Sequence, residues 1–199
     1  MEKDSNENTL EKISKGPSLG FTDNFPKRQM WKELAKEFKG EYKIKHSSGY
    51  GLEIHHVSIP YKKWNIEITV SDTQPLKFQM SFSSLQNFEL TISWDDFIER
   101  IFKIFNKSDV KLGWKKFDKH YLIRTNRSDF VKNIFCNEVQ KKMLKHDVYS
   151  ISYQTDPKNK KAKLLSVIQR RAGTKEMNIE IIEMFKKIID KLEKLKIII

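Results

Sequence analysis

Residues 64–70 read WNIEITV and residues 76–82 read LKFQMSF. In both stretches every second residue is apolar and the residues between are polar or charged. Successive side chains of a β-strand point to opposite faces of the sheet, so each stretch predicts a strand with one dry and one wet face. The short connection 72–75 joins them, and together they predict a hairpin of an antiparallel sheet that is packed on one side.

The sequence on both sides of this hairpin adds further strands and helices. Alternation predicts strands near residues 42–44, 52–56, 90–92, 117–125, 149–153 and 164–168. Helical spacing of apolar residues predicts helices at 26–39, 94–106, 128–145 and from Thr174 onward. In the last helix a heptad-like stripe is formed by Ile181, Phe185, Ile188, Leu192 and Leu195.

Runs of strands with helices between them predict an α+β fold with mainly antiparallel pairing. We expect about four or five strands, then one strand plus a two-strand hairpin, packed with about four helices. Residues 1–22 are polar and aperiodic, which predicts a flexible N-terminal arm. Residues 23–199 are then one α+β domain, or alternatively two intimate halves near 23–109 and 110–199.

Targeting signals are not visible in the sequence. The first residues lack a basic region leading into an apolar run, and no stretch approaches the roughly 18 apolar residues that span a bilayer. We therefore expect a cytoplasmic protein without membrane contact.

Positive charge is concentrated in one segment. The 199 residues include 38 Lys plus Arg and 26 Asp plus Glu, a formal net charge of +12. Residues 110–175 hold 17 of the basic and five of the acidic side chains, and 17 − 5 equals the whole excess. Such a segment suits contacts to phosphates or to an acidic partner. The candidate contacts are Lys111, Lys115, Lys116, Lys119, Arg124, Arg127, Lys158, Lys160, Lys161, Lys163, Arg170 and Arg171.

Trp114 lies among the first of these lysines and is a candidate for stacking on a nucleic-acid base. Only six of the 38 basic residues are arginines, however, and base readout typically uses arginine. A solvated lysine-rich face, or a surface that docks a protein, is therefore the stronger interpretation.

The run Phe117-Asp118-Lys119-His120-Tyr121-Leu122-Ile123 resembles a loosely defined group of uncharacterised bacterial proteins, in which a Phe-Asp dipeptide opens a strand that a helix and a hairpin follow. Trp31 to Ala35 and the strand that starts at Trp64 also fit this layout. The resemblance implies a compact cytosolic domain, assigns no activity and carries no catalytic residue onto this chain.

Motifs for catalysis are absent from the sequence. It contains no Gly-x-Gly-x-x-Gly, no phosphate-loop pattern and no Gly-x-Ser-x-Gly elbow. Neighbouring strand residues His55 and His56 point to opposite faces and cannot both reach one metal ion there. We read Asp95-Asp96 as charge at a helix start, Asp118 as an acceptor of backbone or lysine hydrogen bonds, and Cys136 as an inert buried thiol. We therefore name no catalytic residue, metal or cofactor, while a dispersed active site stays open.

Three functional hypotheses remain. The first is a non-enzymatic binding or accessory domain that recognises a protein partner or its own copy. The alternative is a nucleic-acid-binding protein that uses segment 110–175 for phosphate contacts. The third is an enzyme or small-ligand protein with a pocket between sheet and helix.

Overall fold

The computed structural model describes residues 27–46, 53–71, 73–94, 110–156, 158–168 and 173–199. The predicted N-terminal arm lies outside these residues, as does the predicted helix 94–106 apart from Trp94, which ends a strand. The described residues form eight strands and five helices, at or above the predicted counts. The predicted α+β class with an antiparallel sheet is confirmed.

The elements follow one another along the chain as predicted in outline. The helices are α2 (Arg28–Glu37), α4 (Lys115–His120), α5 (Ser128–Ile134), α6 (Asn137–Lys145) and α7 (Lys175–Lys194). The strands are β1 (Glu41–His46), β2 (Glu53–Tyr61), β3 (Trp64–Ser71), β4 (Leu76–Ser83), β5 (Glu89–Trp94), β6 (Tyr121–Thr125), β7 (Val148–Asp156) and β8 (Lys161–Ile168).

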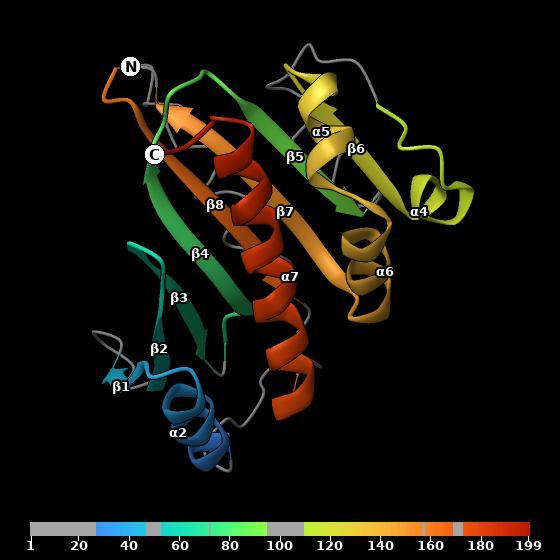
Figure 1. Cartoon of the computed structure of the whole chain (residues 1–199). Coiled ribbons are helices and arrows are strands. Elements are labelled where there is room, and N and C mark those ends of the chain that lie inside the picture. Colours follow the sequence, from blue (N-terminus) through green and yellow to red (C-terminus); the bar gives the residue numbers. More distant parts are fainter. Residues whose placement is uncertain (1–26, 47–52, 72, 95–109, 157, 169–172) are drawn as a thin grey trace, which may run out of the picture.

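All eight strands belong to one antiparallel sheet with the order β1-β2-β3-β4-β8-β7-β5-β6. Two of the joins combine strands that are distant in sequence: β4 pairs with β8, and β5 lies between β7 and β6. Helices α2, α5, α6 and α7 lie on the side of the sheet that faces the viewer in Figure 1. The fold is thus one sheet with helices packed on it, and strands from both halves of the chain interleave.

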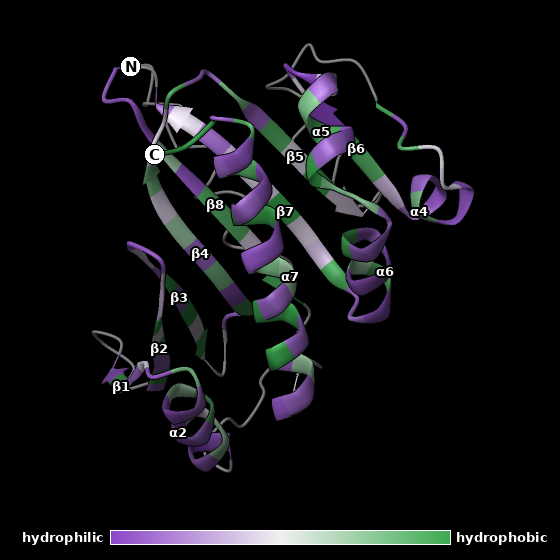
Figure 2. Ribbon diagram, viewed as in Figure 1, coloured by the Kyte–Doolittle hydropathy of each residue, from purple (hydrophilic) through white to green (hydrophobic). Residues whose placement is uncertain are grey.

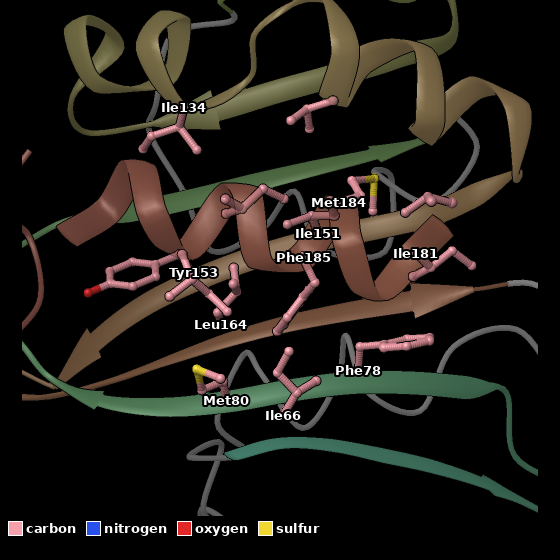
Figure 3. Close-up of a cluster of buried hydrophobic side chains, with 14 of the residues drawn as sticks. Ile66, Phe78, Met80, Ile134, Ile151, Tyr153, Leu164, Ile181, Met184 and Phe185 are labelled. Atoms are coloured by element: carbon pink, nitrogen blue, oxygen red, sulfur yellow. The ribbon is translucent and has the colours of Figure 1, made fainter. Parts of the chain in front are cut away.

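The core lies between α7 and the centre of the sheet. Phe185 of α7 packs against Phe78 of β4 with their ring centroids 6.3 Å apart, and both side chains are fully buried. Figure 3 shows Ile151 and Leu164 of the neighbouring strands in the same cluster. Burying a side chain of this size from water contributes about 1.5–3 kcal/mol. Purple and green alternate along α7 in Figure 2, as expected for a helix with one apolar side.

The heptad-like stripe of the last helix is therefore buried against the sheet of its own chain. Its members Ile181, Phe185, Ile188 and Leu192 are at most 1% exposed. The stripe does not supply a seam for self-association, although its spacing suited one. The predicted cap of this helix is present, because the Thr174 hydroxyl accepts a hydrogen bond from the Met177 N–H at 3.2 Å.

The second face of the sheet is wet only toward the edges. Glu67 and Gln79 are half-buried as the alternation predicts. At the centre, Ser150 and Ser152 of β7 are fully buried and Leu165 of β8 is 1% exposed. Burial on both faces makes β7 and β8 the least accessible strands of the sheet.

Two predicted elements were wrong in their boundaries. Residues 117–125 are not one strand: residues up to His120 form α4, and β6 starts at Tyr121. The reason is local, because the Asp118 carboxylate accepts hydrogen bonds from two backbone N–H groups of the preceding loop and so holds that loop against the helix.

The predicted helix 128–145 is two helices, since Cys136 adopts an extended conformation at ψ 166° between them. Cys136 is accordingly half-exposed at the start of α6 and not buried within a helix.

No helix within the described ranges is both long and apolar enough to cross a bilayer.

Candidate functional site

The predicted basic contacts divide into two groups at opposite ends of the sheet. Lys111, Lys115, Lys116 and Lys119 lie on α4 and the loop before it, next to the start of β6. Lys158, Lys160, Lys161 and Lys163 lie at the turn between β7 and β8. The start of β6 is level with the start of β7, because Trp94 pairs with Tyr121 and its neighbour Ser93 pairs with Ser150.

The turn between β7 and β8 follows the other end of β7. Nine residues of strand separate the two ends, about 30 Å at 3.3 Å per residue. Figure 1 shows this separation, with α4 at one margin of the molecule and the turn near the point marked C at the other. The eight lysines of the two groups therefore do not form one continuous surface.

The four remaining candidates differ from these lysines. Arg127 forms an ion pair with Asp129, and its guanidinium carbon lies 3.9 Å from the centre of the Phe130 ring. Its charge therefore already interacts with neighbouring groups of the same chain. Arg124 is half-buried on β6. Arg170 and Arg171 lie outside the described residues.

The turn between β7 and β8 is held by a carboxylate. Asp156 accepts hydrogen bonds from the Lys158 N–H at 2.9 Å and from the Asn159 side chain at 2.7 Å. These hydrogen bonds lower the pKa of Asp156. Its negative charge is therefore used inside the turn, and within the described residues no carboxylate oxygen lies within 4.0 Å of the ammonium group of Lys158, Lys160, Lys161 or Lys163.

Two distant chain segments complete this end of the sheet. The Leu85 N–H donates to the Ile197 carbonyl at 2.8 Å, and the Ile199 N–H donates to the Ser83 carbonyl at 3.0 Å. The Ser84 N–H donates to the Lys160 carbonyl at 2.7 Å, which joins the same segment to the turn. We define the hairpin corner as the turn residues 156 and 158–160, the flanking residues Lys161 and Lys163, and segments 83–87 and 197–199.

The hairpin corner exposes apolar surface beside its lysines. Leu85 is 53% and Ile199 51% exposed, the two large hydrophobic residues that stand out on the described surface. A hollow of about 250 Å³ next to Leu85 is lined by Ser84, Gln86, Asn87, Thr155 and Lys160 as well. A second, of about 340 Å³, is lined on β4, β7 and β8 by residues that include Gln154 and Lys163.

Two lysines on neighbouring strands, Lys163 of β8 and Lys77 of β4, are partly withdrawn from water. Lys163 is half-buried, and burial lowers its pKa. Burial, together with the nearby charge of Lys163, also lowers the pKa of Lys77 on β4. A bound anion would relieve both effects, because an opposite charge favours the charged form of a lysine. Lys77 was not among the predicted contacts, although it is one of the polar residues of stretch 76–82, which predicted the strand.

A different hollow, of about 440 Å³, lies at the loop before α4 and is lined by Leu112, Gly113, Trp114, Asn137 and Lys141. Trp114 is half-buried and packs against the core. The predicted stacking residue therefore does line a concave surface. Asn137 and Lys141, which come from α6, were not predicted, since nothing in the sequence places α6 beside α4.

The two adjacent histidines have separate partners. Burial of His55 is nearly complete, and its Nδ1 lies 2.7 Å from the Tyr42 hydroxyl. His56 Nε2 lies 2.8 Å from a carboxylate oxygen of Glu67. The two rings face opposite sides of β2, as the alternation predicts. No cluster of three or more His, Cys, Asp or Glu side chains suited to a metal ion occurs in the described ranges.

Comparisons with known proteins find a similar fold but do not assign the chain to a family. No protein-family model and no curated protein matches the chain. The crystal structure of the mycobacterial trehalose monomycolate transport factor A, TtfA, is similar in fold with a TM-score of 0.52. The two share 9% sequence identity over 82% of this chain and 93% of that one. At this identity the likeness establishes a shared arrangement of elements.

Proposed function

We propose that this protein is a non-enzymatic accessory domain that binds an acidic, partly apolar segment of a protein partner at the hairpin corner. One observation carries the proposal: two half-exposed aliphatic side chains stand beside four lysines that have no ion-pair partner among the described residues. The fold-level likeness to a transport factor is compatible with an accessory role. We place this function in the cytoplasm, as the sequence predicts.

The chemistry of the hairpin corner favours a protein over a nucleic acid. A phosphate backbone needs a continuous basic track, and the candidate lysines lie at two ends of the sheet. Exposed aliphatic side chains contribute little to phosphate contacts but anchor well in a protein interface, where apolar residues form the centre and charges the rim. The lysines would set orientation and association rate, and Leu85 and Ile199 would supply the buried contact.

The proposal is tested by fluorescence anisotropy with three labelled peptides of equal length, alternating Glu with Leu, Glu with Ser, and Lys with Leu. We expect the Glu/Leu peptide to bind best, because it alone matches both the charge and the apolar surface. Changing Lys158, Lys160 and Lys161 together to Glu should weaken this binding about five- to 150-fold, from about 1–3 kcal/mol for three surface charge pairs.

A matched triple variant provides the control. Lys111, Lys115 and Lys116 changed to Glu carry the same charge change at the other end of the sheet, and binding should stay within about twofold of the wild type because the Debye length is only about 8 Å at physiological salt. Equal loss in both triple variants, or no preference for Glu/Leu over Glu/Ser, would refute the proposal. Light scattering tests whether the chain instead binds its own copy. If it shows a dimer, and Leu85→Ser dissociates that dimer, the partner at the hairpin corner is a second copy of this chain and not an acidic protein.

A further inference from the structure

The hollow between α4 and α6 is preformed by the chain itself. The Asp118 carboxylate accepts the Leu112 N–H and the Gly113 N–H, each at 2.8 Å. The Val110 N–H donates to the Ile123 carbonyl at 3.0 Å, which fixes the same loop to the edge of β6. A loop held by three hydrogen bonds needs little ordering when a ligand arrives.

The walls of this hollow combine an aromatic ring with hydrogen-bond donors. Trp114 supplies one wall, and Asn137 and Lys141 of α6 supply the other. Gly113 has φ +95°, and apart from its two chain neighbours no residue has an atom within 4 Å of where its Cβ would stand, so this side of the hollow is open. The volume of about 440 Å³ is within the roughly 300–1,000 Å³ of small-molecule sites.

The field around the hollow is positive. Within the described residues, no carboxylate oxygen lies within 4.0 Å of the ammonium group of Lys111, Lys115, Lys116 or Lys141. Of the acidic groups nearby, Glu138 is paired with Lys187, whose ammonium lowers the pKa of Glu138. Asp118 keeps its charge while it accepts the two backbone N–H groups of the loop. Four lysines against this one carboxylate leave a net positive region, which attracts an anion.

Asn137 is the first residue of α6, a helix of nine residues. The first N–H groups of a helix lack intrahelical acceptors and carry the positive end of the helix dipole. The Gln140 N–H is already bound to the Cys136 carbonyl at 3.1 Å, so the earlier N–H groups of this turn are the ones that remain for a ligand. This reinforces the charge of Lys141 on the same wall.

We propose that the hollow binds a planar aromatic anion of the nucleoside-monophosphate class. The aromatic ring stacks on Trp114, and the phosphate is bound by Lys141 and the Asn137 amide. This site lies at the opposite end of the sheet from the hairpin corner, so it is independent of the function proposed above. The same chemistry is offered by a free nucleotide and by a base at the end of a single strand.

Isothermal titration with AMP, adenosine and ribose 5-phosphate tests the site. We expect AMP to bind more tightly than either fragment, because only AMP uses both the ring and the charge. Trp114→Leu should weaken AMP binding about five- to 150-fold, the range for loss of one stacked base. Lys141→Glu, a change at an exposed residue, should weaken AMP about tenfold and leave adenosine unchanged.

The control is Trp64→Leu, since Trp64 is another half-buried tryptophan, on β3 and far from α4 in the strand order. AMP affinity unchanged by both Trp114→Leu and Lys141→Glu, or equal affinities for AMP and adenosine, would overturn the proposal, as would no heat with millimolar AMP. Because binding of AMP does not involve the peptide probes, its failure is distinguishable from failure at the hairpin corner. A single-stranded oligonucleotide that binds more tightly than AMP identifies the strand as the source, and equal affinity identifies the free nucleotide.

Discussion

Replacing Asp118 by Asn tests how the loop before α4 is held. In the wild type each carboxylate oxygen accepts one backbone N–H, from Leu112 and from Gly113, both at 2.8 Å. Asparagine retains one acceptor oxygen but turns an NH₂ group toward the second N–H. The change therefore removes one charge-assisted hydrogen bond and places two donors face to face.

The magnitude follows from these contacts. A hydrogen bond to a charged acceptor contributes about 1.5–3 kcal/mol, and the loop is partly exposed, so we expect a loss of about 1.5–2 kcal/mol in the free energy of unfolding. For a chain of this size that loss lowers Tm by roughly 3–8 °C. Asp118→Ala removes both bonds and should cost about 3 kcal/mol.

The assay is urea unfolding followed by circular dichroism, together with hydrogen exchange of the Leu112 and Gly113 amides. Both amides should exchange faster in Asp118→Asn, because one of them loses its acceptor and the other loses a fixed geometry. Asp129→Asn is the matched control, since Asp129 is exposed and binds a surface arginine two residues away. If Asp118→Asn and Asp129→Asn unfold at the same urea concentration, the carboxylate does not hold the loop and our explanation of α4 is wrong.

Three further changes test other parts of the fold. Gly40→Ala would put its Cβ 2.3 Å from the Ser58 carbonyl oxygen of β2, and we expect urea unfolding to report a loss of about 1–3 kcal/mol as the backbone shifts. Lys160→Gly should instead stabilise the turn by about 0.5–1 kcal/mol, because φ there is +51°, while weakening the Glu/Leu peptide; a less stable variant would contradict this. The pKa of Glu180 is lowered below its ordinary value of 4.5, mainly by the hydrogen bond from the Lys145 ammonium. The charged carboxylate therefore stabilises the fold above pH 4.5, and this stabilisation is lost as the pH falls through the lowered pKa. Glu180→Gln should therefore flatten the acid side of the stability profile measured by thermal unfolding, and an unchanged slope would exclude that role.

The strands at the heart of the fold could be predicted because burial on one side fixes a period of two. The stretches 64–70 and 76–82 correspond within one residue at each end to β3 and β4. The same reasoning failed at 117–125, where the Asp118 carboxylate binds the preceding loop and residues 117–120 are helical despite their strand-like alternation. The break at Cys136 was also missed, since no Gly or Pro marks it.

The candidate sites were only partly predictable, because they depend on strand order. The lysines of both groups were named from composition, and Trp114 from its neighbours. The segments that carry Leu85 and Ile199 lie side by side only because Ser84 bridges to Ile198 across more than a hundred residues of sequence. Local pattern carries no information about such pairings, nor about β5 lying between β7 and β6, which sets the ends of the sheet at which the lysines lie.

The distribution of acidic residues explains why the excess charge is local. Carboxylates of α7 are used to fix neighbouring elements: Asp190 and Glu193 bind Lys62 at the turn between β2 and β3, and Glu180 binds Lys145 of α6. The lysines of α4 and of the hairpin corner are left without such partners among the described residues. Since about 30 Å separates the two groups and the Debye length is about 8 Å at physiological salt, neither group stabilises a ligand at the other. The lysines of α4 and those of the hairpin corner therefore act as two independent surfaces, and ligands of the two should bind without competition.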